Sequence, residues 1–453
     1  MVFDIHEYLE KKKDIERTYE DTDAFYRLCA DIKNDFFLEW EASEDSSSAL
    51  EMQRRAIIGH EKEKNFFFEK IRTSLRERAA ENTAYPLWYE DLVEGIYHEV
   101  WGLAGMAQWF DEAHKESSSA KIIGKNIFFM EDGHMVRMAQ TISEDRKEQM
   151  IRAFLLNSPE KRMDKDYYEI YLLDGTRVTA YLEPMAKKGC SSIVFRRYLV
   201  PNLSFEEQAK RGTIPKDSIQ MLKAMAGIGF NVAFLGAVRT AKTTFLSTFQ
   251  SYEDPSLEGV MVETDPEIPM DRVLPGAPLI QLLADGDKLL KISKSLLRSD
   301  ADYFIMAEAR DGIALDTVLR LASKGTKRMK ITFHTRDPKR FPLEVATEIV
   351  KSTGGDLPQT IKMAASAFDY LFHFIQLSDK NQKRLKGIYQ IDSKADGTFS
   401  IESICEYDPL LESWAFKDFI GEGQRSFGLE SDPEKFMAFE SELKKLAKKG
   451  YVK

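Results

Sequence analysis

The sequence predicts an α/β protein whose C-terminal half is built on a parallel sheet, with a smaller α+β domain and a helical region before it. Three observations support this fold class. Four short, almost continuous apolar runs are separated by helical stretches, a pattern typical of parallel strands covered on both faces. Runs that alternate apolar and polar residues around Asp-Gly turns precede them. The beginning of the chain is rich in Glu and Lys, with apolar residues at helical spacing.

The bulk composition describes a globular protein of more than one domain. The chain has 453 residues, more than one hydrophobic core usually serves. Its net charge is −10, which argues against a broad basic face for nucleic acid. The three cysteines lie far apart without metal-binding spacing, as expected in a reducing cytoplasm. No apolar run is long enough to span a membrane, so we expect any membrane association to be peripheral or through a partner.

Changes of pattern along the chain divide it into five predicted segments. The α+β segment contains "NIFFMEDGHMVRM", "YYEIYLLDGTRVTAYLEP" and "CSSIVFRRYLV". The segments are a helical N-terminal extension (1–90), the α+β domain (91–202), a linker (203–217), a domain of parallel strands and helices (218–391) and a C-terminal extension of short strands and a charged helix (392–453).

The four apolar runs each end on a residue of chemical interest. The runs are "NVAFLG", "GVMVE", "YFIMAE" and "KITFHT", which end at or next to Gly236, Glu263, Glu308 and His334. In an open α/β sheet, ligands bind outside the carboxyl ends of the strands. We therefore expect these four residues to gather at one edge of the sheet.

The stretch "GAVRTAKTT", Gly236 to Thr244, resembles a phosphate-binding loop between a strand and a helix. In such a loop backbone N–H groups and the helix N-terminus bind phosphate oxygens, a lysine reaches the β- and γ-phosphates, and the next hydroxyl binds magnesium. Lys242 and Thr243 fit the last two roles. The predicted nucleotide-binding residues are Gly236, Arg239, Thr240, Ala241, Lys242, Thr243 and Thr244. A simple strand-to-helix turn is the alternative.

Ala241 stands where the loop pattern has glycine. If the backbone needs a positive φ there, the Cβ costs on the order of 1 kcal/mol or more. Such a cost weakens a nucleotide site without abolishing it, and Arg239 supplies a cation that can compensate.

The other strand ends carry acids and a histidine. Glu308 in "SDADYFIMAEARDG" is placed to hold the water shell of Mg²⁺ or to polarise the attacking water, although an acid after a strand is also a common helix start. Glu263 begins the acidic stretch "VETDPEIP", which otherwise reads as a solvated turn. His334 is placed to sense the γ-phosphate as a hydrogen-bond donor, and a structural histidine is the alternative.

The order of these motifs resembles that of the secretion ATPases of type II and type IV systems. "GAVRTAKTT", "VETDPE", "LLRSDADYFIMAEARDG" and "TFHTRDP" are similar to that family's Walker A, Asp box, Walker B and His box. The stretches "GLAGMAQWFDE", "NIFFMEDGHMVR", "DGTRVTAYLEP" and "SIVFRRYLV" are similar to its N-terminal domain. The resemblance covers roughly 91–391, and it leaves out the first ninety residues and the C-terminal extension.

The resemblance implies a RecA-like ATPase domain that binds ATP and Mg²⁺. Lys242 takes the phosphate-binding role, Thr243 and Glu308 bind the metal, and either Glu263 or Glu308 activates water. His334 takes the His-box role. Arginines of the N-terminal domain serve the family as charge-neutralising fingers, and the positions that match are Arg177, Arg196 and Arg197. Arg177 and Arg196 are the two that we predict to be catalytic, and Arg298 and Arg310 flank the Walker B motif.

The resemblance also implies a cytoplasmic hexamer that works with inner-membrane components of a secretion or conjugation machine. We expect ATP hydrolysis to power a type IV apparatus for conjugative DNA or protein transfer, without sequence-specific nucleic-acid binding. A type II secretion or pilus-assembly ATPase is one alternative. Ala241 and the helical extension favour a second, a nucleotide-binding scaffold that does not hydrolyse ATP. An unrelated P-loop kinase or nucleic-acid translocase is a third, which the acidic balance and the absence of a visible acceptor site weaken.

Overall fold

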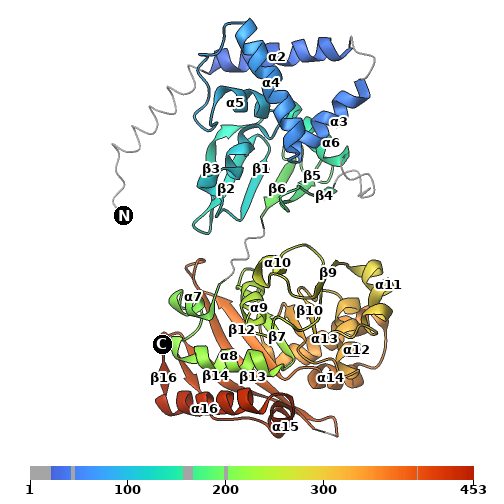
Figure 1. The fold of residues 1–453 in the computed structure, drawn as a ribbon, viewed down its shortest axis with the longest axis vertical. Coiled ribbons are helices and arrows are strands. Elements are labelled where there is room, and N and C mark those ends of the chain that lie inside the picture. Colours follow the sequence, from blue (N-terminus) through green and yellow to red (C-terminus); the bar gives the residue numbers. More distant parts are fainter. Residues whose placement is uncertain (1–21, 42–45, 157–166, 198–202, 395) are drawn as a thin grey trace. The chain divides into compact units, whose positions relative to one another are not determined.

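A computed structural model describes residues 22–41, 46–156, 167–197, 203–394 and 396–453 (Figure 1). The contacts divide the chain into two compact units, Met1–Leu199 and Val200–Lys453. In the described parts, no helix combines the length and the apolar character needed to cross a membrane.

The first unit combines helices with a six-stranded antiparallel sheet. The order of its strands is β3-β2-β1-β6-β5-β4. The strands are β1 (Ser119–Ile123), β2 (Asn126–Glu131), β3 (His134–Thr141), β4 (Tyr167–Tyr171), β5 (Arg177–Tyr181) and β6 (Ser192–Arg196). The helices are α2 (Asp23–Glu41), α3 (Ser46–Ile57), α4 (Glu61–Glu77), α5 (Leu92–Val100) and α6 (Glu144–Leu156), with short 3-10 turns η1 (Ala104–Phe110) and η2 (Glu112–His114).

The predicted helical extension (1–90) and the predicted α+β domain (91–202) share one hydrophobic core over their described residues. Rings from both sides of that boundary pack together: Phe36 of α2 and Phe67 of α4 lie 4.5 Å and 4.9 Å from Trp101, centroid to centroid. All three rings are buried. The described residues of both segments therefore bury apolar surface against each other in one core.

The second unit is built on a ten-stranded mixed sheet with the order β16-β15-β14-β13-β12-β7-β11-β10-β8-β9. The strands are β7 (Val232–Gly236), β8 (Gly259–Glu263), β9 (Leu279–Leu283), β10 (Tyr303–Met306), β11 (Lys330–Phe333), β12 (Tyr370–Gln376), β13 (Lys383–Ser393), β14 (Phe399–Asp408), β15 (Ser413–Phe416) and β16 (Tyr451–Val452). Six neighbouring strands pair in parallel, in the order β12, β7, β11, β10, β8 and β9. Strands β13, β14, β15 and β16 extend the sheet beyond β12 with antiparallel pairing.

Helices cover both faces of the parallel part. The helices of this unit are α7 (Phe205–Lys210), α8 (Ile219–Ile228), α9 (Lys242–Gln250), α10 (Met270–Val273), α11 (Gly286–Leu296), α12 (Gly312–Ser323), α13 (Phe341–Thr353), α14 (Leu357–Ser366), α15 (Glu422–Ser431) and α16 (Pro433–Lys449), with 3-10 turns η3 (Lys216–Ser218) and η4 (Pro338–Arg340). Phe234 and Leu235 of β7 are fully buried in the two separate cores that lie on opposite faces of the sheet. The near-continuous apolar run of this strand follows from that double burial. The predicted α/β class is confirmed.

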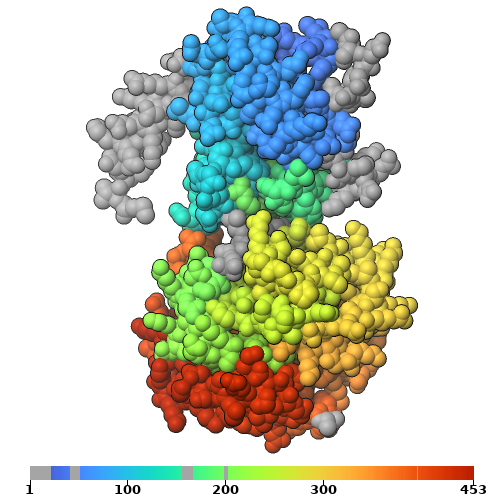
Figure 2. All heavy atoms as spheres, viewed as in Figure 1, coloured from blue at the N-terminus to red at the C-terminus, as the bar shows by residue number. Residues whose placement is uncertain are grey.

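The predicted C-terminal extension is part of the same sheet and core. Strands β13 to β16 widen the sheet, and α16 packs along α8. Figure 2 shows the C-terminal residues, in red, over one face of the second unit. Phe436, Phe439 and Leu443 of α16 are fully buried in the core that also contains Phe234 of β7.

The segment predicted as a linker, 203–217, carries helix α7. It folds against the second unit, where α7 begins with a capping box between Ser204 and Glu207. Phe205 is fully buried, and its ring stacks on Tyr252 at 4.5 Å. The sequence did not indicate the buried position of Phe205, because the segment is mostly polar and one aromatic ring in a short helix gives no periodic pattern.

Replacing Phe205 by alanine should destabilise the second unit by about 3–5 kcal/mol, because the change leaves a cavity in the core. Denaturant-dependent hydrogen exchange of the α9 peptides measures that loss. Phe419→Ala, at a site that is 38% exposed, is the matched control and should cost much less. Equal protection of α9 in the two variants would mean that Phe205 does not stabilise the core of the second unit.

Candidate functional site

The parallel strands place the four predicted strand-end residues at one edge of the sheet. Strands β8, β10, β11 and β7 are neighbours in that order, and each pair is parallel. Gly236 and Glu263 are the last residues of β7 and β8, while Glu308 and His334 lie just beyond β10 and β11. Four residues from separate parts of the sequence therefore lie at the same edge, where ligands of such sheets bind.

The loop after β7 is closed on itself by hydrogen bonds to one carbonyl. The Thr240 hydroxyl and the Lys242 ammonium donate to the Ala237 carbonyl oxygen at 2.9 Å and 2.7 Å. Gly236 has a φ of +143°, and a Cβ there would lie 2.3 Å from the Phe374 carbonyl oxygen of β12. Only glycine fits at that position, since the clash is with backbone.

Two residues of the loop other than glycine adopt a left-handed conformation. Ala241, the N-cap of α9, has φ +73° and ψ +21°, and Arg239 has φ +64°. The predicted need for a positive φ at position 241 is therefore met by alanine, at a cost of about 1–2 kcal/mol. Alanine therefore holds the left-handed conformation at the start of α9 that glycine would adopt without this cost.

Lys242 is the buried cation of the site. Its exposed fraction is 6%, and burial lowers its pKa to about 8, although the charges of Glu308 and Glu267 oppose the shift. Its Nζ lies 3.4 Å from Nδ1 of His334. A cation that loses part of its hydration at the start of a helix is poised to bind an anion, because the anion restores the lost stabilisation.

Glu308 is held between its neighbouring strands and paired with two basic groups. The backbone N–H groups of Ala307 and Ala309 donate to carbonyls of β8 and β11 at 3.0 Å and 3.1 Å. Its carboxylate lies 3.6 Å from Nε2 of His334 and forms an ion pair with Arg310. Burial raises its pKa, but the hydrogen bond from His334 and the charge of Arg310 outweigh burial, so the pKa is lowered and the carboxylate stays ionised.

Glu263 differs from Glu308 in its surroundings. It is 5% exposed, and its Oε1 accepts hydrogen bonds from the backbone N–H groups of Glu267 at 3.2 Å and Ile268 at 3.1 Å. Burial raises its pKa to about 8, in spite of those two hydrogen bonds. The side chain therefore braces the acidic turn and carries a proton at neutral pH.

The predicted catalytic arginines belong to the first unit. Arg177 of β5 and Arg196 of β6 are direct cross-strand partners. Arg177 forms an ion pair with Glu169 at 2.5 Å, whereas Arg196 is exposed. Arg197 has a structural role: its guanidinium lies 3.9 Å from the Trp109 ring and donates to the Trp109 carbonyl oxygen at 2.8 Å.

The side chains that can hold Mg²⁺ carry only oxygen donors. The Thr243 hydroxyl lies in the first turn of α9, and the ionised carboxylate of Glu308 lies beyond β10. Thr243 and Thr244 are both partly exposed. Oxygen ligands from one or two side chains, completed by phosphate and water, are what Mg²⁺ takes in nucleotide sites. The residues present therefore fit the cation.

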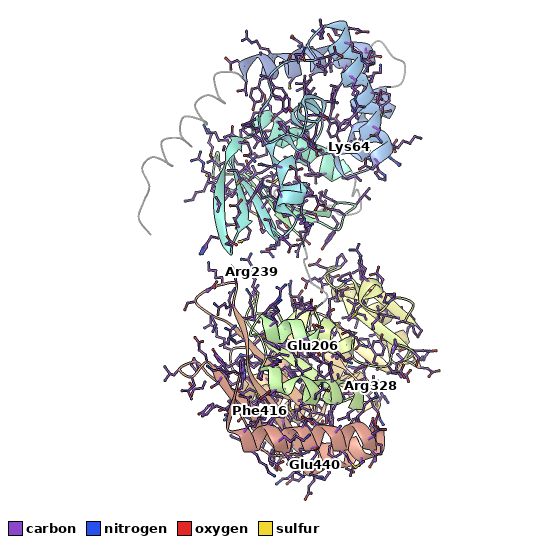
Figure 3. The ribbon with its side chains drawn as sticks, turned by 60° about the vertical axis from the view of Figure 1, so that its left-hand side comes forward. Lys64, Glu206, Arg239, Arg328, Phe416 and Glu440 are labelled. Carbon is purple, nitrogen blue, oxygen red and sulfur yellow. The ribbon has the colours of Figure 1, made fainter. Side chains whose placement is uncertain are left out.

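Lys383 is a basic residue near the loop that the sequence motifs did not reveal. It begins β13 and pairs with Gln376 of β12, close to the partner of Gly236. Burial lowers its pKa, and the charge of Arg239 adds to that shift while Asp379 opposes it. Figure 3 shows Arg239 at the rim of the second unit. The turn "SDKNQKR" carries the charges but follows no recognisable pattern, so only the strand pairing locates it.

Comparison with known proteins gives structural neighbours only. No protein family model matches the chain, and no curated protein sequence matches it. Solved structures with a similar fold include the VirB11 ATPase of the Brucella suis type IV secretion system in complex with sulphate, which is 14% identical at a TM-score of 0.34. The match covers 63% of this chain and 92% of that one.

Two further neighbours are of the same kind. The Legionella pneumophila ATPase DotB is 15% identical at a TM-score of 0.45, over 76% of this chain and 88% of that one. The pilus retraction motor PilT with bound ADP is 13% identical at a TM-score of 0.43, over 74% and 91%. The chain is similar in structure to secretion and pilus ATPases.

Ala241→Gly should leave the free energy of unfolding of the second unit unchanged or raise it by up to about 1 kcal/mol. Relief of the left-handed strain favours the folded loop, while the added freedom of glycine favours the unfolded chain. Ala438→Gly, at an exposed position within α16, is the control and should cost about 1 kcal/mol. A loss at position 241 as large as the control's would contradict the left-handed assignment.

Glu263→Gln should gain stability over the wild type as the pH rises from 5 to 8. In that range the unfolded chain loses the Glu263 proton while the folded chain keeps it, so the wild type loses up to about 1.4 kcal/mol per pH unit. Hydrogen exchange of the β8 peptides at pH 5 and pH 8 gives the difference. Glu258→Gln, at the exposed approach to β8, is the control. A gain that does not depend on pH would show that Glu263 is already ionised.

Proposed function

We propose that this protein is an ATPase that uses Mg²⁺ and powers a type IV secretion apparatus for conjugative DNA or protein transfer. One observation carries the proposal. Lys242, His334, Glu308 and Arg310 form a chain of contacts beside a phosphate-binding loop, although they come from three separate parts of the sequence. This set pairs a cation for phosphate with an ionised carboxylate for the metal, as nucleotide hydrolysis requires.

In this proposal, triphosphate binding opens the loop. Lys242 leaves the Ala237 carbonyl and pairs with phosphate oxygens, and the N–H groups at the start of α9 supply further donors. Arg239 and Thr240 border the same loop, and Thr243 and Glu308 hold the metal. When bound there, Mg²⁺ would supply positive charge to the phosphates.

His334 and the two acids then divide the remaining roles. His334 contacts both Lys242 and Glu308. A phosphate that moves Lys242 therefore also changes the contacts of His334 with Glu308. Burial raises the pKa of Glu263 to about 8, whereas the pKa of Glu308 is lowered, which favours Glu308 as the ionised acid at neutral pH. Glu308 is therefore the proposed site of metal binding and water polarisation, with Glu263 supporting the acidic turn. Arg177 and Arg196 are proposed as the charge-neutralising arginines.

We further propose that the protein acts in the cytoplasm as a homo-oligomer, a ring of six by resemblance, beside inner-membrane partners of the machine. Sequence-specific nucleic-acid binding has no part in this function. The strained alanine supports one alternative, a nucleotide-binding scaffold that does not hydrolyse ATP. A type II secretion or pilus ATPase is a second alternative that shares the same site.

Turnover of Mg-ATP by Lys242→Ala should fall on the order of 100-fold or more, and substrate transfer in cells should be lost with it, because the variant lacks the buried phosphate cation. Lys444→Ala, at an exposed position of α16, is the control. Full turnover by Lys242→Ala would contradict the proposal. An inactive wild type that becomes active on Ala241→Gly would favour the scaffold.

A further inference from the structure

One end of the ten-stranded sheet exposes apolar and basic side chains together. The edge strand β9 and helix α11 carry Ile280, Leu283 and Leu290, each 58% exposed. Lys291 and Lys294 lie beside Leu290 on the exposed side of α11. We call this surface the basic edge. Exposed apolar side chains on an edge strand are uncommon in isolated proteins, because such strands attract partners.

The charge of the basic edge is unlike that of the whole chain. The stretch 279–298 has four cations and two carboxylates within a protein of net charge −10. The cations are Lys288, Lys291, Lys294 and Arg298; all are exposed, and none has an ion-pair partner among the described residues. Figure 2 shows part of this segment, in yellow, at the surface of the second unit. A partner for this surface must offer apolar groups surrounded by negative charge.

The turn between β14 and β15 offers that combination. Leu410 is 93% exposed and Leu411 is 49% exposed, although both are large apolar residues. The Asp408 carboxylate accepts the N–H groups of Leu410 at 2.8 Å and Leu411 at 3.2 Å, so the two leucines are presented by a fixed turn. Glu406 and Glu412 are exposed on either side. We call this surface the acidic hairpin.

The two surfaces lie near opposite outer strands of one sheet, and both follow the carboxyl ends of strands that run in the same direction. Strand β14 runs in the direction of β7, because β12 is parallel to β7 and two antiparallel pairings follow. Seven strand steps separate β14 from β9, or roughly 30 Å at the usual strand spacing. In Figure 1, α11 and β16 mark opposite sides of the second unit. One chain cannot bring its own two surfaces together.

We propose that the basic edge of one copy of this chain binds the acidic hairpin of the next copy. The contact pairs leucines with leucines and lysines with carboxylates, so both the apolar and the charged groups find complements. Because the two surfaces differ, the contact is head-to-tail, and repeating it closes a ring when the rotation per subunit allows. The inference rests on the oligomer in the proposed function and identifies its contact surfaces.

Charge reversal on each surface tests the contact in the full-length protein. Lys291→Glu combined with Lys294→Glu should weaken self-association at least tenfold in sedimentation velocity, and Glu406→Lys combined with Glu412→Lys should do the same. One chain that carries all four changes should recover self-association, because its reversed surfaces are complementary again. Lys394→Glu combined with Lys448→Glu makes the same charge change at exposed lysines outside both surfaces and should leave association unchanged.

Other outcomes overturn the inference. The inference fails if the wild type stays monomeric with and without Mg-ATP. It also fails if the reversed variants assemble normally, or if the fourfold variant does not recover self-association. Circular dichroism must show that each protein is folded. Binding of a fluorescent ATP analogue, measured in parallel, distinguishes a failure of the nucleotide site from a failure of the ring contact. An assembly that depends on these surfaces in a protein that binds no nucleotide would contradict the proposed function alone.

Discussion

The parallel pairing of β7 with β11 and β12 is the constraint on which the rest of the site depends. Pairing with β11 brings the loop after β7 next to His334, and β10 on the far side of β11 adds Glu308. Pairing with β12 places the Phe374 carbonyl so close to Gly236 that only glycine fits. The burial of β7 on both faces holds these registers, because a slip by one residue would exchange the residues of its two cores.

Within that frame the nucleotide-free loop satisfies its own donors. Thr240 and Lys242 share the Ala237 carbonyl, which holds the loop in shape while Ala241 and Arg239 keep their left-handed backbone. Phosphate oxygens would replace one internal hydrogen bond of Lys242 by charge-assisted ones. The strain at Ala241 is thus present before any ligand binds, and it is compatible with a loop that accepts one.

The sequence predicts the parts of the site that depend on local pattern. The ends of the four apolar runs, the loop and Lys242 all follow from strand burial and from motif spacing. The parts it leaves out depend on tertiary contacts: Phe205 is anchored by Tyr252, and the proton on Glu263 results from burial. Strand β9 gives little signal because its apolar residues are half exposed at the sheet edge, unlike the buried runs. The sequence does not predict either surface of the proposed ring contact, because the position of each surface depends on the order of the strands in the sheet.

Calorimetric titration with Mg-ATP tests the central claim, that a loop with alanine in place of glycine still binds triphosphate through Lys242. The account predicts saturable binding by the wild type and at least tenfold weaker binding by Lys242→Met, which keeps the length of the side chain and removes its charge. Equal affinities of the two proteins, or no binding by the wild type, would contradict it.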